Sequence, residues 1–243
     1  KNNEIIKNTK KNKDSHPPSP KESQTTLYKS KLVPDSKPKP PGRKMNREEI
    51  RFLSDIACRP LSTTVSRYQR LSLSRRHGNA VRQQLVSAGI IEAVTIATRS
   101  GQVVLYQLTE FGRTACSAAG IDPGPRARQS LEHSFWVNRA ARYFENKAYD
   151  ISREHPVKGN GAIDILAEKP GERVAVEVET GKSNVKGNLD KIRDAGFDRI
   201  VLVATSPAAV TVCQKAIDSS QDDKSRVEQL SWLDISGELS LPQ

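Results

Sequence analysis

Three carboxylates, Asp164, Glu177 and Glu179, have the residue type and the spacing to do chemistry together. They lie in the stretch Gly161–Lys182, where apolar residues recur at every second position on either side of Pro170-Gly171. That alternation is typical of two half-buried strands, and the Pro-Gly dipeptide is typical of the turn that joins them. Carboxylates gathered in this way bind hard divalent cations such as Mg²⁺.

The register of this hairpin decides whether the carboxylates meet. If the turn is its tip, Lys169 pairs with Glu172, and the same register places Asp164 opposite Glu177 with β-carbons about 5 Å apart. Glu179 follows Glu177 on the same face, about 7 Å along the strand. Like charges this close destabilise a sheet unless a cation lies among them. The sequence therefore predicts three carboxylates on one patch.

The opposite face of the hairpin is predicted to be apolar, formed by Ile163, Ile165, Val174, Val176 and Val178. Two interpretations of the acidic face remain open: a solvent-facing surface that is acidic by chance, or a covered metal site. Helical patterns before and after the hairpin favour the second, because they would cover both faces of the sheet. Covered carboxylates are costly unless they are paired or bound to a metal.

At these residues the chain resembles the PD-(D/E)xK nuclease superfamily, which is restriction-endonuclease-like and Holliday-junction-resolvase-like in fold. Asp164 matches the Asp of the family pattern, and Glu177 in the run VEVE matches the acidic residue of the next strand. Glu179 stands where Lys is usual, which leaves the identity of the general base open. The resemblance covers roughly residues 128–235 and implies an α/β fold with a mixed sheet flanked by helices.

The resemblance also implies a cofactor and roles. Mg²⁺, with Mn²⁺ as a substitute, would be held by Asp164, Glu177 and the carbonyl of Val178, since this ion prefers oxygen ligands. Glu179 or Lys182 would assist the attacking water. These residues are the predicted catalytic and metal-binding set.

Two predicted helices beside the hairpin carry further candidates. Glu132 lies in the first turn of a helix expected over 129–147, where it is either an extra metal ligand or a complement to the helix dipole. Lys191 lies on a helix expected over 184–195 and would touch a DNA phosphate. The remaining core elements are expected to be strands over 149–155, 198–204 and 227–235 and a helix over 207–217, within a domain spanning 128–243.

The residues before this core differ in composition. The formal net charge of +11 indicates a polyanionic partner. Residues 1–44 are rich in Lys and Pro and poor in apolar residues, so they are predicted to be a disordered basic linker. The three cysteines fit no zinc or disulfide spacing and are predicted to be small buried hydrophobes. No apolar run is long enough for a membrane span, so we expect no membrane partner and a cytoplasmic location.

Residues 45–120 predict helices over 47–57, 62–71 and 75–88, strands over 90–97 and 102–108, and a helix to 119, followed by a short hinge over 121–128. This order, with the runs LVSAGII and YQLTEFG, resembles a winged helix-turn-helix domain. Its third helix carries residue types that contact phosphates and base edges. They are Arg75, Arg76, Asn79, Arg82 and Gln83. Binding of a protein partner is the alternative.

The function predicted from these patterns is a metal-dependent DNA endonuclease with a winged-helix DNA-binding module, as in mobile elements or DNA-processing systems. The alternative is a non-catalytic DNA-binding or scaffold protein with a degenerate nuclease fold, which the Glu in place of Lys supports. The expected partner is DNA. A DNA-translocating ATPase, the remainder of a longer chain that precedes Lys1, and a second copy as a homodimer stay open as further partners.

Overall fold

The computed structural model describes residues 44–157, 161–193, 195–220 and 224–235. The linker predicted over 1–44 therefore lies outside the described residues, except for Lys44. Contacts place every described residue in one compact unit. None of the described helices is long and apolar enough to cross a membrane.

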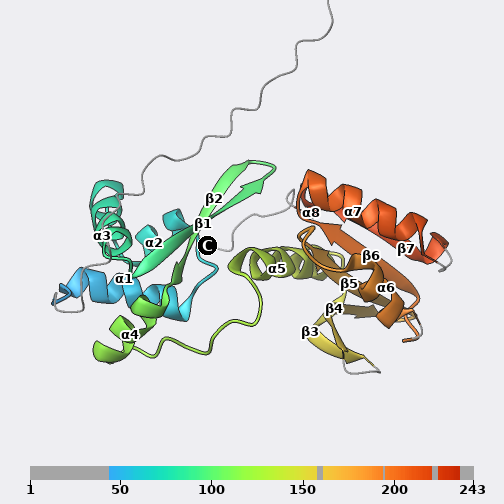
Figure 1. Ribbon diagram of the computed structural model, residues 1–243, viewed down its shortest axis with the longest axis horizontal. Helices are drawn as coiled ribbons and strands as arrows, with labels where there is room; N and C mark the ends of the chain where they lie inside the picture. The colour runs from blue at the N-terminus through green and yellow to red at the C-terminus, as the bar shows by residue number, and fades with distance from the viewer. Residues whose placement is uncertain (1–43, 158–160, 194, 221–223, 236–243) are drawn as a thin grey trace, which may run out of the picture. The chain divides into compact units, whose positions relative to one another are not determined.

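Residues 46–119, the N-terminal segment, form four helices and a hairpin, coloured blue to green in Figure 1. The predicted order is confirmed, with boundaries close to those expected. The elements are α1 (Arg47–Cys58), α2 (Thr64–Arg70), α3 (Arg75–Ser87), β1 (Ile91–Thr98), β2 (Gly101–Leu108) and α4 (Glu110–Ala118). Its separate apolar core is centred on α1, α3 and the hairpin, with Phe52, Leu85 and Tyr106 fully buried.

Polar caps set where these helices begin. Asn46 Oδ1 accepts the backbone N–H of Glu49 at 2.9 Å, while the Glu49 carboxylate accepts the Asn46 N–H at 3.0 Å. This reciprocal pair satisfies donors that the first turn of a helix leaves free. Ser74 and Thr109 cap α3 and α4 with side-chain oxygens, each of which accepts one backbone N–H of the first turn.

Packing explains why a glycine, Gly78, lies in the interior of α3. Sequence reasoning assigns it only a cost of about 1 kcal/mol relative to Ala. A β-carbon at this position would lie 2.6 Å from Cε1 of Tyr68. The Tyr68 ring therefore packs directly on the helix backbone, and its hydroxyl donates to Asn79 Oδ1 at 3.0 Å. Gly78 allows α2 and α3 to approach closely.

Residues 131–235, the α/β segment, are a mixed five-stranded sheet with helices on both faces. Strand order is β3-β4-β5-β6-β7, antiparallel from β3 to β5 and parallel from β5 to β7. This architecture is compatible with a nuclease-like fold. The elements are α5 (Leu131–Glu145), β3 (Asp150–Val157), β4 (Gly161–Lys169), β5 (Glu172–Glu179), α6 (Val185–Ile192), β6 (Arg199–Ala204), α7 (Pro207–Asp218), a short 3₁₀ helix (Lys224–Arg226), β7 (Val227–Ser231) and α8 (Trp232–Ile235).

The hairpin register is the predicted one. Lys169 pairs with Glu172 across the Pro170-Gly171 turn, and the ladder continues to Ile165 opposite Val176. Gly171 has φ of 80°, the left-handed conformation that such a turn requires of glycine. Asp164 and Glu177 occupy the next position, where the paired ladder has ended, because the Asp164 side chain takes the next free backbone N–H of β5.

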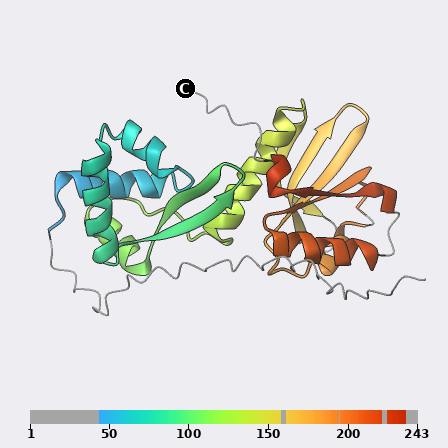
Figure 2. The same ribbon diagram turned by 90° about the horizontal axis from the view of Figure 1, so that it is seen from above.

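Two apolar layers cover the sheet, and Figure 2 shows α5 on one face and α7 on the other. Val174, Val176 and Val178 pack beneath α5, as the alternation predicts, and Ala175 packs beneath α6 and α7. The prediction for Ile163 is wrong: it packs with the second layer, whereas Ile165 packs with the first.

The change of face at Ile163 coincides with an irregularity in β3. Glu154, which lies between the pairs Arg153–Ile165 and His155–Ile163, has φ of 47°. A non-glycine residue in this region bends and twists a strand locally. Strict alternation therefore fails beside Asp164, where β4 is no longer a regular ladder strand.

Two other predictions are corrected. The last strand ends at Ser231, because Ser231 N and Oγ both donate to Asp234 Oδ2 at 2.7 Å and start a helical turn. The hinge predicted over 121–128 is partly fixed to α4. Arg113 donates to the carbonyl oxygens of Pro123 and Gly124. Arg126 Nε donates to Glu110 at 3.1 Å.

Candidate active site

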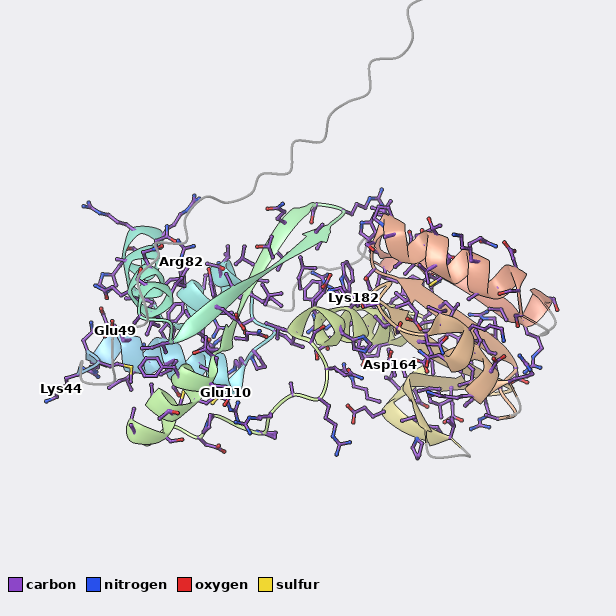
Figure 3. The ribbon with its side chains drawn as sticks, viewed as in Figure 1. Lys44, Glu49, Arg82, Glu110, Asp164 and Lys182 are labelled. Carbon is purple, nitrogen blue, oxygen red and sulfur yellow. The ribbon has the colours of Figure 1, made fainter. Side chains whose placement is uncertain are left out.

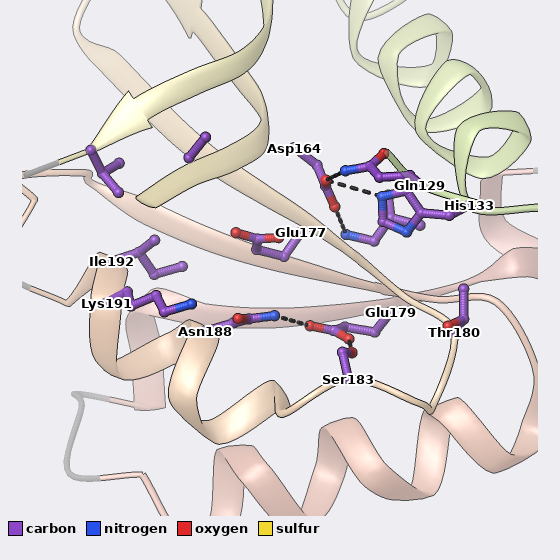
Figure 4. Close-up of a pocket in the computed structure, with 13 residues that line it drawn as sticks. Gln129, His133, Asp164, Glu177, Glu179, Thr180, Ser183, Asn188, Lys191 and Ile192 are labelled. Carbon is purple, nitrogen blue, oxygen red and sulfur yellow. Dashed lines mark hydrogen bonds and ion pairs between the residues drawn. The ribbon is translucent and has the colours of Figure 1, made fainter. Parts of the chain in front are cut away.

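The three predicted carboxylates meet in a cavity of about 230 Å³ between the start of α5, the hairpin and α6 (Figure 4). Asp164 and Glu177 are each 8% exposed and Glu179 is 1% exposed. The interpretation of a solvent-facing acidic hairpin is therefore wrong. The cavity is lined by Gln129, His133, Val157, Ala162, Asp164, Glu177, Val178, Glu179, Thr180, Ser183, Asn188, Lys191 and Ile192.

Asp164 is held by three donors. Its Oδ2 accepts the backbone N–H of Val178 at 2.8 Å. Its Oδ1 contacts His133 Nε2 at 3.0 Å and accepts from Gln129 Nε2 at 3.3 Å. Burial favours the neutral acid, but the His133 hydrogen bond and charge, the Val178 N–H and a bond from Glu177 together lower the pKa of Asp164 below its ordinary value. Asp164 is therefore the ionised member of the cluster.

Glu177 has the opposite character. Burial first, and then the negative charges of Asp164 and Glu179, raise the pKa of Glu177 to about 9. A hydrogen bond to Asp164 adds to this effect, and Lys191 opposes it. At neutral pH without a bound cation, Glu177 is consequently protonated. The site carries more carboxylates than its own cations can neutralise.

Glu179 is fixed by residues of the following loop and helix. Asn188 Nδ2 donates to Glu179 Oε1 at 3.0 Å, and Ser183 Oγ donates to Oε2. The backbone carbonyl of Glu179 accepts from both the N–H and the hydroxyl of Thr205. Asn184 caps α6 and so sets the position of Asn188 on it. Glu179 thus points into the cavity in one defined orientation, as Figure 4 shows.

The two candidate lysines differ in their places. Lys191 lines the cavity and stabilises the ionised form of Glu177. Lys182 is exposed and does not line the cavity. It can be found with Asp164 in Figure 3. Of the two predicted helpers, only Lys191 belongs to the walls of the site.

The helix before the sheet contributes other residues than the one predicted. Glu132 lies in the first turn of α5 but does not line the cavity. His133, one residue later, and Gln129, which precedes the Ser130 cap, line it instead and contact Asp164. Because α5 begins at Leu131, Gln129 lies outside the helix, and the spacing of 129 and 133 gives no helical signal for these contacts. The Ser130 cap, which accepts the His133 N–H at 3.1 Å, sets where the helix begins.

A divalent cation fits the chemistry of these groups. In the part of the chain that the structure describes, no three His, Cys, Asp or Glu side chains form a set that could hold a metal by themselves. Mg²⁺, however, usually takes one or two carboxylates and keeps several waters. Asp164 and Glu177 form such a pair beside the Val178 backbone. The raised pKa of Glu177 indicates that a compensating positive charge is lacking at this position.

The predicted DNA-binding residues of α3 fall into two groups. Arg75, Arg76 and Gln83 are exposed. Asn79 and Arg82 are half-buried and bonded within the segment. Tyr68 donates to Asn79, and Arg82 contacts the Tyr106 hydroxyl at 3.4 Å. Gln83 Nε2 also donates to Ser87 Oγ at 3.4 Å. Among these five residues, Arg75 and Arg76 can therefore reach a ligand without giving up an internal hydrogen bond.

Comparisons with known proteins add little. No family model matches the sequence, and no curated protein matches it. Among solved structures, the chain is similar to a repair endonuclease from Pyrococcus abyssi, with 14% sequence identity and a TM-score of 0.28. The match covers 60% of this chain and 63% of that protein. At this level the likeness carries no argument, so the case for a function depends on the cavity.

Proposed function

We propose that residues 128–243 are a metal-dependent nuclease domain of the PD-(D/E)xK type that hydrolyses phosphodiester bonds in DNA. One observation carries the proposal: two adjacent buried carboxylates, Asp164 and Glu177, share a cavity with too little positive charge to neutralise them. Burial of such a pair is costly without a cation. Lys191, on the wall of the same cavity, is suited to a phosphate oxygen.

The residues divide the work as follows. Asp164, Glu177 and the carbonyl of Val178 would hold Mg²⁺, which when bound lowers the pKa of a water and stabilises charge on the phosphate. Glu179 accepts the proton of the attacking water. Glu179, and not Lys182, takes this role because Glu179 lines the cavity and Lys182 does not. The Lys191 ammonium group stabilises the negative charge of the phosphate oxygens.

The bond changes balance. The water oxygen bonds to phosphorus, the bond from phosphorus to the leaving sugar oxygen breaks, and that oxygen takes a proton from solvent. Ser183 and Asn188 hold Glu179 so that it faces the reacting water. Positioning of this kind contributes to catalysis because the base need not be ordered during the reaction.

The test is cleavage of linear, nicked, flapped and four-way DNA in Mg²⁺ or Mn²⁺. Wild-type protein is expected to cut at least one form, and Asp164→Ala and Glu177→Gln to cut none, while both keep the wild-type circular dichroism spectrum. Glu145→Gln, at an exposed position at the end of α5, is the matched control and retains activity. Cleavage that persists in both cavity variants would refute the proposal.

We also propose that residues 45–120 are a winged helix that binds DNA through α3, with Arg75 and Arg76 as phosphate contacts. Each lost contact flattens the plot of log affinity against log salt by about one unit for duplex DNA. Changing both arginines to Ala should therefore flatten it by about two units. Lys215→Ala, on the exposed side of α7, is the control and leaves the slope unchanged. An unchanged slope in the double variant would assign α3 to protein docking.

A second function, a non-catalytic DNA-binding or scaffold protein, is favoured by one observation. Glu179 replaces the usual Lys, and its two oxygens are already occupied by Ser183 and Asn188. Comparing DNA cleavage by wild type and by the variant Glu179→Lys, which restores the commoner family pattern, distinguishes the two functions. A wild-type protein that binds DNA but cuts no form with either metal would support the scaffold.

A further inference from the structure

Asp164 receives an unusual number of hydrogen bonds for a residue proposed to bind metal. The Val178 N–H reaches Oδ2, and His133 and Gln129 both reach Oδ1. A backbone N–H and an amide N–H can only donate, so Asp164 accepts at both oxygens, as a carboxylate does. The His133 Nε2 must then carry a hydrogen and donate it as well. Oδ1 then uses both of its lone pairs, and Oδ2 keeps one for a cation.

The His133 donor is itself rigidly placed. His133 is in the first turn of α5, and its backbone N–H donates to the Ser130 cap at 3.1 Å. Its side chain is 17% exposed and faces Asp164, as Figure 4 shows. The helix in turn is anchored by Phe135 and Trp136, which are buried against the sheet. The imidazole therefore meets Asp164 at a fixed position before any ligand arrives.

We infer that His133, assisted by Gln129, is a positioning residue that fixes the Asp164 carboxylate for the cation. This inference rests on the proposed function, because it assigns a purpose to the orientation of a proposed ligand. A carboxylate that rotates freely loses conformational entropy when it binds a metal. Hydrogen-bond donors that already fix its orientation reduce that loss. Partners of this kind typically change metal affinity by about 10- to 100-fold when they are lost.

His133 acts through Asp164 and not on the metal. Its Nε2 already donates to Asp164 Oδ1 at 3.0 Å, so this nitrogen has no lone pair to offer a cation. A glutamine at the same position carries an N–H at a similar distance from the backbone as Nε2. The variant His133→Gln should thus retain the contact, whereas His133→Leu has a similar volume and no donor.

The test is direct Mn²⁺ binding without DNA, followed through the free-ion signal in electron paramagnetic resonance. His133→Leu is expected to weaken Mn²⁺ binding by about 10- to 100-fold, and His133→Gln to bind nearly as wild type does. Ser134→Ala, on the same turn and outside the cavity lining, is the control and binds as wild type does. Thermal unfolding confirms that each variant is folded.

The outcomes are separable. Wild-type protein that binds no Mn²⁺ would overturn both the proposed metal-dependent function and this inference. Wild-type affinity in a folded His133→Leu protein would overturn the inference alone. Equal loss in folded His133→Gln and His133→Leu would make His133 itself a ligand. If His133→Leu does not fold, Gln129→Leu replaces it, and wild-type affinity in that variant would overturn the inference.

Discussion

Replacing the ionisable carboxyl group of Glu177 should stabilise the metal-free protein, and more so as the pH rises. Burial, followed by the charges of Asp164 and Glu179, raises the pKa of Glu177 from 4.5 to about 9 in the folded protein. Between those two values the folded protein holds a proton that the unfolded chain has lost. The associated stability is complete below the unfolded pKa and is lost as the pH rises through the folded pKa. Glu177→Gln keeps the size of the side chain and removes this dependence.

The magnitude follows from the size of the shift. Each unit between the two pKa values corresponds to about 1.4 kcal/mol. By pH 7 the wild-type protein should have lost about 3 kcal/mol relative to acid conditions, a large part of a typical unfolding free energy of about 5–15 kcal/mol. Asp164 affects the stability at low pH. Its pKa is lowered, so the stability it contributes is lost only as the pH falls through that lowered value.

Urea unfolding with EDTA, at several values between about pH 5 and pH 8.5, measures this difference. The gap between Glu177→Gln and wild type should widen by about 1.4 kcal/mol per pH unit. Glu145→Gln, an exposed carboxylate variant, should follow wild type. Parallel curves for wild type and Glu177→Gln would refute the reasoning, because Glu177 would then titrate alike in both states. Added Mg²⁺ should stabilise wild type and narrow the gap, since a ligand of the folded state raises its stability.

Three further outcomes are expected. Gly78→Ala should lower the unfolding free energy by about 1–3 kcal/mol, because its β-carbon would meet the Tyr68 ring at 2.6 Å; a higher melting temperature would disprove this tight packing. Asn46→Ala should cost about 1 kcal/mol in chemical denaturation through loss of the α1 cap, and no loss would mean that the end of α1 frays. A thiol reagent should label Cys58, which is exposed, in the folded protein. Burial raises the pKa of Cys213 to about 12, so Cys213 should react only after unfolding. Rapid labelling of Cys213 in the folded protein would contradict its burial.

Local patterns were sufficient to predict the hairpin and its carboxylates. The period of two and the Pro170-Gly171 turn determine the register, and the register determines which side chains share a face. Burial of Glu177 followed from the helical patterns on both sides. These inferences depend on residues close in sequence, or on the covering of a whole face, and the structure bears them out.

Contacts between distant elements were not predictable in the same way. The sequence pointed to Glu132, yet a turn of about 100° per residue along α5 brings His133 to the cavity instead. The face of Ile163 depends on the irregular backbone at Glu154, for which no turn residue gives a signal. The prediction that all three cysteines are buried is wrong for Cys58, because the end of α1 leaves it exposed.

The attachment of residues 121–126 to α4 shortens the free tether between the two segments. With Pro123, Gly124 and Arg126 bonded to α4, only residues 127–129 connect it to the Ser130 cap of α5. A chain of that length reaches about 10 Å when extended. A ligand held by the N-terminal segment would therefore be presented to the α/β segment at an effective concentration in the millimolar range. Inserting residues into the connection 127–129 would lower that effective concentration while leaving both segments intact.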